Sequence, residues 1–382
     1  MHAPASSKLR VVIAGGGVAA LETALALAEL APDSTTRVLI APNAEFVYRP
    51  MTVQEPFAYP AARRYRLEQI VADAHAELVA GEVTRVEPEK QIVHTRAGAQ
   101  MEYDALVLAL GAVARPRYAH AITINDRRLD ETFHGLLQDV EGGYIRAIAF
   151  VSPGRMAWPL PIYELALMTA ARAYDMSLEI DLTLITPEER PLAIFGTRAS
   201  SAVLELLEQS RIETINSAYA EVPREGEVVI HPGDRRLHVN RVVALPELYG
   251  PPLGGVPLGE NGFIPVDSYA QVPGAGPIYA AGDATQFAVK HGGLAAQQAD
   301  IAAISIAAMA GEGMPRRRFE PMIHGMLLTG EKPLYLAARI SGSRASTSDV
   351  TESATWWPPT KIVAPYLAPY LDERDTKASA PS

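Results

Sequence analysis

The stretch KLRVVIAGGGVAALETALALAEL, residues 8–30, decides the fold of this chain. The four residues before its first glycine form an apolar run, as expected for a strand that is buried on both faces. In the G-x-G-x-x-G/A pattern that follows, Gly15 permits the tight turn, Gly17 lets backbone N–H groups approach a pyrophosphate, and Ala20 lets helix and strand pack closely. The stretch therefore predicts a strand, a turn and a helix that bind a dinucleotide, with its phosphates at the positive end of the helix. A glycine-rich turn without a ligand is the alternative.

The second predicted strand, TRVLIAPN (residues 36–43), lacks a residue that such a site usually has. An acid at its end normally binds the adenosine ribose, and Ala41 occupies that place here. Asn43 and Glu45 are the candidate substitutes.

Length, charge and cysteine content narrow the class of protein. A chain of 382 residues fits two intertwined domains followed by a tail. The 34 Lys and Arg residues against 44 Asp and Glu residues give a net charge of −10, which argues against nucleic acid as a partner. Cysteine is absent from the sequence, so disulfides, thiolate metal sites and thiol-based redox chemistry are excluded. A polar start and no apolar run of ~18 residues predict a cytoplasmic protein.

Two later segments add to the first loop. YDALVLALGAVARP (residues 103–116) reads as a strand that runs into Gly111, and GPIYAAGDAT (residues 276–285) as a strand that ends in Gly282 and Asp283. With the first loop, these motifs resemble those of the two-dinucleotide-binding-domain flavoproteins, the pyridine nucleotide–disulfide oxidoreductase superfamily. The resemblance implies bound FAD, with Gly111 and Gly282 among its contacts and Asp283 holding the ribityl chain.

An internal repeat supports the same organisation. Residues 83–112 and 220–248 share alternating apolar positions, a glycine-containing turn and a final apolar strand. The predicted fold is α/β, with two Rossmann-like domains, the second inserted in the first, and a C-terminal segment. The predicted boundaries are 1–115 and 260–316 for the FAD-binding domain, 116–259 for a degenerate NAD(P)-type domain and 317–382 for a C-terminal interface segment.

The second domain departs from the pattern at its phosphate loop. Where relatives that bind NAD(P)H carry glycines, this sequence has Trp158, Pro159 and Pro161. Proline offers no N–H to a phosphate, and the tryptophan fills the space that a pyrophosphate needs. The matching strand ends in Thr186 instead of an acid, with Glu188 as the candidate substitute. We therefore predict weak or absent nicotinamide binding. Trp158 either packs against its surroundings or faces the flavin as part of a substrate pocket.

Two further segments resemble sulfide:quinone oxidoreductases and type II NADH dehydrogenases, one branch of the superfamily. They are EFVYRPMTVQEP (residues 45–56) and KHGGLAAQQADIAA (residues 290–303). The resemblance implies that Arg49, Pro50 and Gly292 help to bind the cofactor. In the sulfide enzymes a redox cysteine lies at the place of Ala157, so the usual persulfide route is excluded here.

Lys290 is the residue that we expect to tune the flavin. By resemblance it precedes a helix whose N-terminus points at the pyrimidine ring, where a cation and the helix dipole stabilise the reduced, anionic form. The alternative is a solvated pair of Lys290 and His291 in a surface loop. Arg49 either approaches the cofactor or an anionic acceptor, or is a surface arginine. The histidines show no metal-ligand spacing.

The C-terminal segment contains TWWPPTKIVAPYLAPYLDERD, residues 355–375. Closure over the flavin or a homodimer contact is the favoured interpretation. Contact with a membrane surface, which suits tryptophan and tyrosine, is the less favoured one.

The sequence thus predicts an FAD-dependent oxidoreductase in which Lys290 and Trp158 serve the chemistry. Electrons pass without thiols to a quinone-like or other acceptor, from NAD(P)H or a small reductant. The alternatives are a sulfide:quinone-type scaffold used for another substrate without nicotinamide, and a flavin-binding protein that is not an enzyme. The predicted location is the cytoplasm, and the alternative is a peripheral location at a membrane.

Overall fold

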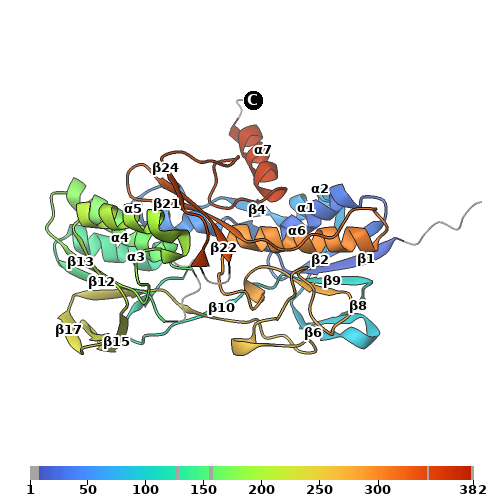
Figure 1. Cartoon of the computed structure of the whole chain (residues 1–382), viewed down its shortest axis with the longest axis horizontal. Helices are drawn as coiled ribbons and strands as arrows, with labels where there is room; N and C mark the ends of the chain where they lie inside the picture. Colours follow the sequence, from blue (N-terminus) through green and yellow to red (C-terminus); the bar gives the residue numbers. More distant parts are fainter. Residues whose placement is uncertain (1–7, 126–128, 155–157, 342–343, 380–382) are drawn as a thin grey trace, which may run out of the picture.

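The computed structural model describes residues 8–125, 129–154, 158–341 and 344–379, and two parallel five-stranded sheets organise it. They lie at opposite ends of the long axis (Figure 1). The first sheet has the order β20-β9-β1-β2-β5 and contains β1 (Leu9–Ala14), β2 (Thr35–Ala41), β5 (Ala76–Ala80), β9 (Ala105–Leu108) and β20 (Ile278–Ala280). The second has the order β11-β18-β12-β13-β14 and contains β11 (Ile122–Thr123), β12 (Ala147–Val151), β13 (Asp181–Ile185), β14 (Ile212–Ile215) and β18 (Arg241–Ala244).

Strand β1 is buried on both faces, as its apolar run predicts. Val11 and Ile13 join the core formed with helices α1 (Val18–Leu30) and α6 (Gly292–Met309). Val12 and Ala14 join the core on the other face, which the antiparallel sheet β6 (Val83–Glu87), β7 (Ile92–Thr95) and β8 (Gln100–Glu102) covers. Alternate residues of one strand thus supply two separate cores.

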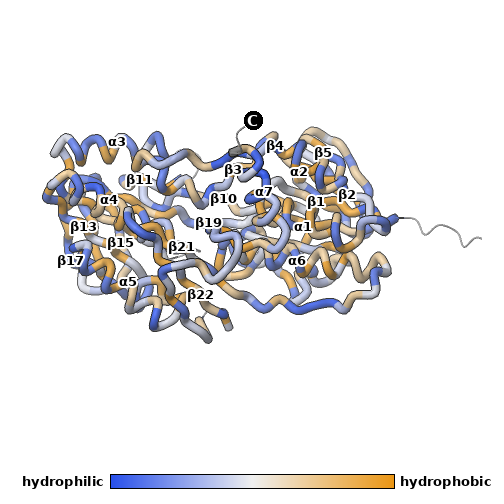
Figure 2. Tube along the Cα trace, turned by 90° about the horizontal axis from the view of Figure 1, so that it is seen from above, coloured by the Kyte–Doolittle hydropathy of each residue, from blue (hydrophilic) through white to orange (hydrophobic). Residues whose placement is uncertain are grey.

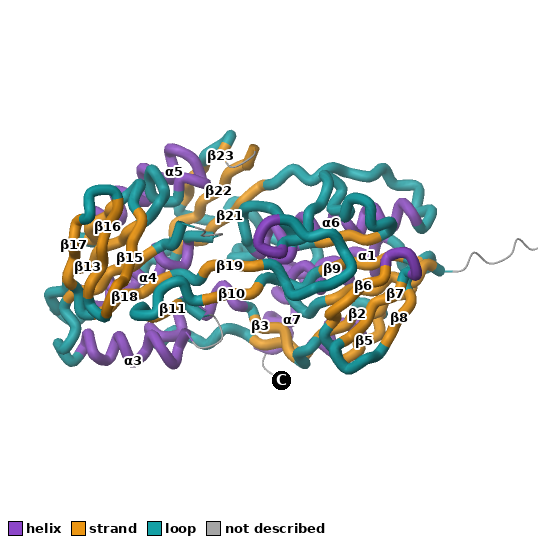
Figure 3. The backbone as a smooth tube through the Cα atoms, turned by 90° about the horizontal axis from the view of Figure 1, so that it is seen from below, coloured by secondary structure: helices purple, strands orange, loops and turns teal. Residues whose placement is uncertain are grey.

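The second sheet repeats this arrangement. Helices α3 (Leu129–Glu141), α4 (Leu160–Asp175) and α5 (Gly196–Gln209) belong to the core on one face. The antiparallel sheet β15 (Tyr219–Arg224), β16 (Glu227–His231) and β17 (Arg235–His238) covers the other face. Figure 3 shows both antiparallel sheets from below. The repeat predicted from the sequence is therefore present as two structural units.

The two units are joined by an antiparallel pair, β10 (Val113–Arg115) and β19 (Glu247–Tyr249). All strands of the second sheet come between β9 and β20 of the first in sequence. The chain therefore leaves the first sheet, builds the second and returns, which supports the predicted insertion without fixing its boundaries.

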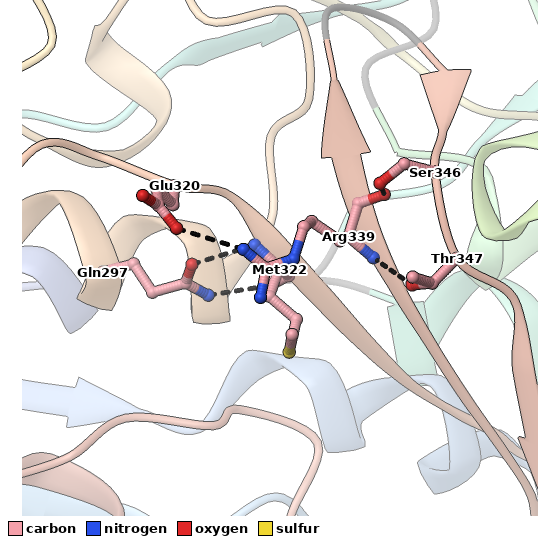
Figure 4. Close-up of polar contacts among 6 residues, drawn as sticks. All are labelled: Gln297, Glu320, Met322, Arg339, Ser346 and Thr347. Atoms are coloured by element: carbon pink, nitrogen blue, oxygen red, sulfur yellow. Dashed lines mark hydrogen bonds and ion pairs between the residues drawn. The ribbon is translucent and has the colours of Figure 1, made fainter.

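The C-terminal segment packs against both units. Its strands β21 (Met322–Leu327) and β22 (Leu334–Ser341) form a hairpin whose buried residues join the core of the second sheet. Gln297 of α6 binds the backbone of Met322 at 2.7 and 3.0 Å, and Arg339 binds Glu320 at 3.0 Å (Figure 4). Seen from above, the hairpin lies between the two sheets, whose strands are largely hydrophobic (Figure 2).

The remaining elements are shorter or peripheral. They are β3 (Glu45–Val47), the 3₁₀ helix η1 (Arg49–Phe57), β4 (Arg64–Arg66), α2 (Leu67–Asp73), η2 (Pro88–Lys90), η3 (Ala193–Phe195), η4 (Glu260–Gly262), η5 (Gly282–Ala284), β23 (Arg344–Ala345), β24 (Asp349–Thr351) and α7 (Leu367–Ser379). Over the residues that the structure describes, no helix is both long and apolar enough to cross a bilayer.

Candidate functional site

The loop after β1 can be built only with glycine at its first position. Gly15 has φ +134°, and a Cβ placed on it would lie 2.1 Å from the carbonyl oxygen of Ala109. Gly17 is the N-cap of α1, and nothing lies within 4 Å of the position that its Cβ would take. Ala20 is fully buried in the core shared with β1. A tight turn and an open helix N-terminus without an acidic residue in its first turn are what a pyrophosphate requires.

The other two glycine motifs meet this loop at one sheet edge. Strands β20, β9 and β1 are neighbours, so the residues that follow them lie side by side. Gly111 has φ +72° with open space around its Cβ position. Gly282 has φ +76°, and its Cβ would lie 3.1 Å from that of Ala295 in α6. The structure thus brings together Gly15, Gly17, Gly111, Gly282 and Asp283.

The end of β2 has no acid in the usual ribose place. Ala41 is buried there, and Asn43 and Glu45 beyond it are exposed. Glu45 lies 3.9 Å from Nη1 of Arg64. A ribose at this edge would therefore meet the exposed Asn43 and Glu45.

The segment of Arg49 and Pro50 begins η1, and Arg49 is exposed. The carbonyl oxygen of Pro50 accepts a hydrogen bond of 3.0 Å from Nζ of Lys361. The same Nζ lies 2.6 Å from Oε1 of Glu164, and both side chains are almost fully buried, at 4% and 2% exposed. Lys361 was not predicted from the sequence to belong to the site, although it is the one basic residue between the tryptophan pair and Arg374.

Burial is the largest influence on this ion pair. It raises the pKa of Glu164 and lowers the pKa of Lys361, and each charge opposes the shift of the other. Glu164 also accepts a hydrogen bond of 3.0 Å from the N–H of Leu328. The pair therefore connects α4, η1 and the C-terminal segment at one buried point.

Lys290 and His291 are buried, with 7% and 8% of their surface exposed, so the alternative of a solvated surface pair is wrong. Nζ of Lys290 donates to the carbonyl of Thr285 and lies 3.9 Å from the ring centroid of Phe263. Burial lowers the pKa of Lys290 to about 8, and the charge of Asp283 opposes this shift. Lys290 is therefore a buried cation beside Asp283 at neutral pH, near the glycine motifs.

His291 and Trp158 form an aromatic contact at the N-terminus of α6. Their ring centroids are 4.4 Å apart, and Trp158 also meets Phe195 edge-on at 5.8 Å. Burial lowers the pKa of His291 to about 3, so its ring is neutral. A Cβ on Gly292 would lie 2.9 Å from Ile362, which shows how closely the C-terminal segment approaches α6. These contacts give Trp158 a packing role, and its predicted place facing the flavin stays a prediction.

In the second domain, side chains contact one another around the predicted nucleotide site. The ring of Tyr219 lies so close to Gly154 that an added Cβ would be 2.8 Å from it. Glu188 accepts hydrogen bonds from the hydroxyls of Tyr163 at 2.7 Å and Thr186 at 3.2 Å. Burial raises the pKa of Glu188 to about 6. Ala157, the place of the redox cysteine in the sulfide enzymes, lies outside the described residues.

The two tryptophans of the C-terminal segment differ in their surroundings. Trp356 contacts the rings of His324 at 4.9 Å and Tyr335 at 5.5 Å, whereas Trp357 is 80% exposed. Within the described ranges, no group of three or more His, Asp or Glu residues could hold a metal ion.

Comparison with known proteins agrees with this geometry. Residues 9–142 match the family model described as pyridine nucleotide-disulphide oxidoreductase. Among curated proteins, none matches the sequence.

Solved structures share the fold at low sequence identity. The sulfide:quinone oxidoreductase of Aquifex aeolicus superposes with a TM-score of 0.81 at 18% identity, over 97% of this chain and 90% of that chain. A ferredoxin reductase from Rhodopseudomonas palustris gives 0.66 at 18% identity, over 87% and 83%. NDH2 from Plasmodium falciparum in complex with NADH gives 0.60 at 16%, over 73% and 64%. Residues 9–142 therefore resemble the pyridine nucleotide-disulphide oxidoreductase family, and the chain shares the fold of these solved structures although its sequence contains no cysteine.

Proposed function

We propose that this protein is an FAD-dependent oxidoreductase that exchanges electrons with a quinone-like acceptor and does not use NAD(P)H as its donor. FAD is the cofactor because three glycine motifs meet at the carboxyl edge of the first sheet. Gly17 and Gly111 leave open space, and the first turn of α1 carries N–H donors without a side-chain cap. Bound there, FAD would supply the two-electron chemistry between donor and acceptor.

The proposal that NAD(P)H is not the donor rests on one observation: the carboxylate of Glu188 already accepts hydrogen bonds within the protein. In a Rossmann-like domain the acid after the second strand binds a ribose hydroxyl. Here Tyr163 and Thr186 already donate to Glu188, and Ala193 N–H lies 3.2 Å from its other oxygen. Because the ring of Tyr219 also covers Gly154, an entering dinucleotide would displace an aromatic side chain and break buried hydrogen bonds.

The residues near the N-terminus of α6 support one class of acceptor over another. Lys290 holds a buried positive charge, and the rings of His291 and Trp158, which pack on each other beside it, are neutral at pH 7. A planar, uncharged acceptor suits such aromatic surroundings, and a buried cation favours negative charge on a reduced oxygen. This arrangement supports a quinone-like acceptor in preference to a charged one.

The ion pair of Lys361 and Glu164 fixes the geometry of this region. Through the carbonyl of Pro50 it holds the start of η1, and through Leu328 it holds the C-terminal hairpin. Both contacts exclude water, because the two side chains are buried. We assign the pair a positioning role between the two units.

Anaerobic reduction of the FAD-loaded protein tests the proposal. We expect duroquinol to bleach the visible flavin band within minutes, because the acceptor site also works in reverse, whereas micromolar NADH and NADPH leave the band unchanged over that time. Rapid bleaching by micromolar NADH would contradict the nicotinamide part. Bleaching by dithionite alone would favour the third possibility, a flavin-binding protein that is not an enzyme.

A further inference from the structure

Helix α7 packs against α1 and α2 of the first unit, and its beginning is bound by a carboxylate of α1 (Figure 1). Oε1 of Glu22 accepts the N–H of Tyr366 at 3.0 Å, and Oε2 accepts the N–H of Leu367, the first residue of α7, at 2.6 Å. Glu22 is fully buried. Because the first N–H groups of a helix lack intrahelical partners, Glu22 supplies from another helix what an N-cap residue usually supplies.

A second carboxyl group lies against Glu22. Asp300 of α6 is hydrogen-bonded to Glu22, and among the described residues its Oδ1 is buried without a hydrogen-bond partner. Over the same part of the chain, burial, hydrogen bonds and the two groups themselves influence these carboxyls, and no cation does. Two adjacent buried carboxyl groups without a cation do not both ionise readily. Asp300 therefore holds a proton and donates it to Glu22 in a hydrogen bond.

Burial is the largest influence on both groups. It raises the pKa of Glu22 to about 7, although the N–H groups of Tyr366 and Leu367 favour the ionised form. Burial and then the charge of Glu22 raise the pKa of Asp300 to about 9. Between these values a charged Glu22 has three donors, which are the two N–H groups and the hydroxyl of Asp300.

The other charged groups near the start of α7 act on Tyr366. Burial raises the pKa of its phenol, the charges of Asp300 and Glu29 raise it further, and the charge of Arg317 lowers it. Loss of the proton from Asp300 leaves two negative charges side by side, and one of them loses its donor. Water can hydrate both only where the start of α7 moves away, because Glu22 is fully buried.

The remaining contacts of α7 are apolar or partly exposed. Leu367, Ala368 and Leu371 join the core shared with α1. Arg374 donates to Asp73 of α2 at 2.7 Å, and their side chains are 31% and 49% exposed. Ion pairs of this exposure contribute little to stability. The buried contact with Glu22 is therefore the polar contact on which docking of α7 depends most.

We propose that Glu22 and Asp300 form a pH-sensitive switch, in which α7 stays docked while Asp300 holds its proton and is released when that proton passes to water. Release also frees one end of residues 360–366. This segment lies against the N-terminus of α6, where Ile362 approaches Gly292 and donates its N–H to the hydroxyl of Tyr48 at 2.8 Å. The inference does not rest on the proposed electron transfer.

Single cysteines measure the release, because the sequence contains no other thiol. Leu371→Cys changes a position of α7 that is 4% exposed, and Glu373→Cys changes a side chain that is 66% exposed. Labelling by iodoacetamide, followed by mass spectrometry, gives the ratio of the two rates and so cancels the pH dependence of the thiol itself. We expect the ratio to increase about tenfold between pH 8 and pH 10, because loss of one proton above the pKa of Asp300 changes the equilibrium up to tenfold per pH unit. A ratio that does not change with pH would overturn the proposal.

Two further cysteines test whether α7 moves separately from the rest of the chain. Ala368→Cys, at a position that is 6% exposed, repeats the measurement with a smaller change of side chain. Val203→Cys reports unfolding of the second unit, where Val203 is fully buried, and should stay unlabelled over the same pH range. Labelling of Val203→Cys that increases in parallel with that of Leu371→Cys would overturn the proposal, because α7 would then not be released by itself.

Variants in the Leu371→Cys background assign the effect to one carboxyl group. Asp300→Asn keeps a donor for Glu22 and removes the proton that can leave, so the ratio should stay constant up to pH 10. Asp73→Asn is the matched control, since it weakens the contact with Arg374 at the surface. It should increase the ratio at every pH and keep the tenfold pH dependence. An Asp300→Asn variant with the pH dependence of the parent would overturn the assignment to Asp300.

Discussion

Nζ of Lys361 lies 2.6 Å from Oε1 of Glu164, although 197 positions separate the two residues in the chain. Glu164 belongs to the first half of α4 and Lys361 to the segment before α7. The pair is buried, and the carboxylate of Glu164 has a second partner in the N–H of Leu328. It is therefore the point at which the second unit, η1 and the C-terminal segment depend on one another.

Removing one partner of this pair should destabilise the protein strongly. Lys361→Met leaves Glu164 buried and unpaired, which costs about 3–5 kcal/mol of unfolding free energy. Urea unfolding followed by circular dichroism measures the loss. Lys377→Met, at an ion pair with side chains 73% and 66% exposed, should cost about 0–1 kcal/mol.

The double variant Lys361→Met with Glu164→Gln separates loss of the pair from loss of packing. It should recover part of the stability, because no charge is then left buried without a partner. A single Lys361→Met variant that is as stable as the Lys377→Met control would show that the pair does not join the three elements.

The charge of Lys290 should control the flavin potential in a pH-dependent way. Lys290→Met keeps the length of the side chain and removes its charge, so the potential should fall by roughly 20 mV if the contact contributes ~1 kcal/mol. Because burial lowers the pKa of Lys290 to about 8, the difference between wild type and variant should be present below pH 8 and disappear above it. Dye equilibration at pH 6.5 and pH 9.5 measures both values. An equal potential for both proteins at pH 6.5 would show that Lys290 does not act on the flavin.

The same pKa has a consequence for stability with a definite sign. A lysine with a folded pKa near 8 and an ordinary unfolded pKa binds fewer protons in the folded state between these values. Its contribution to stability therefore rises with pH above about 8. Thermal unfolding from pH 7 to pH 10 should show a rise for the wild type relative to Lys290→Met, and parallel curves would contradict the assignment.

Glu22 of α1 and Asp300 of α6 should make the protein less stable as the pH increases, which opposes the effect of Lys290. Burial raises the pKa of Glu22 to about 7 and that of Asp300 to about 9, and the two side chains share a hydrogen bond. For carboxyl groups with raised folded pKa values, the stability is present at low pH and is lost as pH increases towards 9. Asp300→Asn keeps a hydrogen-bond donor for Glu22 and removes one titrating group, so the stability of the variant should decrease less as the pH increases. Melting temperatures of both proteins between pH 5 and pH 9 test the prediction, and an equally steep loss in the variant would contradict it.

The first loop should not tolerate any side chain at its first glycine. Gly15→Ala places a Cβ 2.1 Å from the carbonyl oxygen of Ala109, so the loop must move and FAD should be lost. Gly17→Val should also abolish the yellow colour, because it fills the open space at the helix N-terminus. Gly135→Ala, within α3 where nothing lies within 4 Å, is the control and should keep the cofactor. Retention of stoichiometric FAD by Gly15→Ala would mean that the cofactor binds elsewhere.

Features that depend on local sequence could be predicted. The loop at Gly15 requires a positive φ, a close approach and an adjacent apolar strand, and all three are visible in consecutive residues. The meeting of Gly111 and Gly282 follows from parallel strands that share one edge. The weak nicotinamide binding that we infer from Trp158 and its neighbouring prolines stays a prediction.

Features that depend on contacts across the fold could not be predicted. Nothing near Lys361 in the sequence indicates Glu164 as its partner, because α4 and the C-terminal segment meet only after both units have folded. The covering of Gly154 by Tyr219 depends on how the β15 strand packs against the second sheet. The burial of Lys290 depends on Phe263 and Thr285, which reach it from other segments.

The most direct test of the account is native mass spectrometry of the full chain with saturating FAD and one millimolar NADH. The central claim is that the first unit holds a dinucleotide and the second does not. The account predicts a single species that carries one FAD and no NADH. A species with one FAD and one NADH would contradict the claim that Tyr219 and the bonded Glu188 close the second site, and a chain without FAD would contradict the claim as a whole.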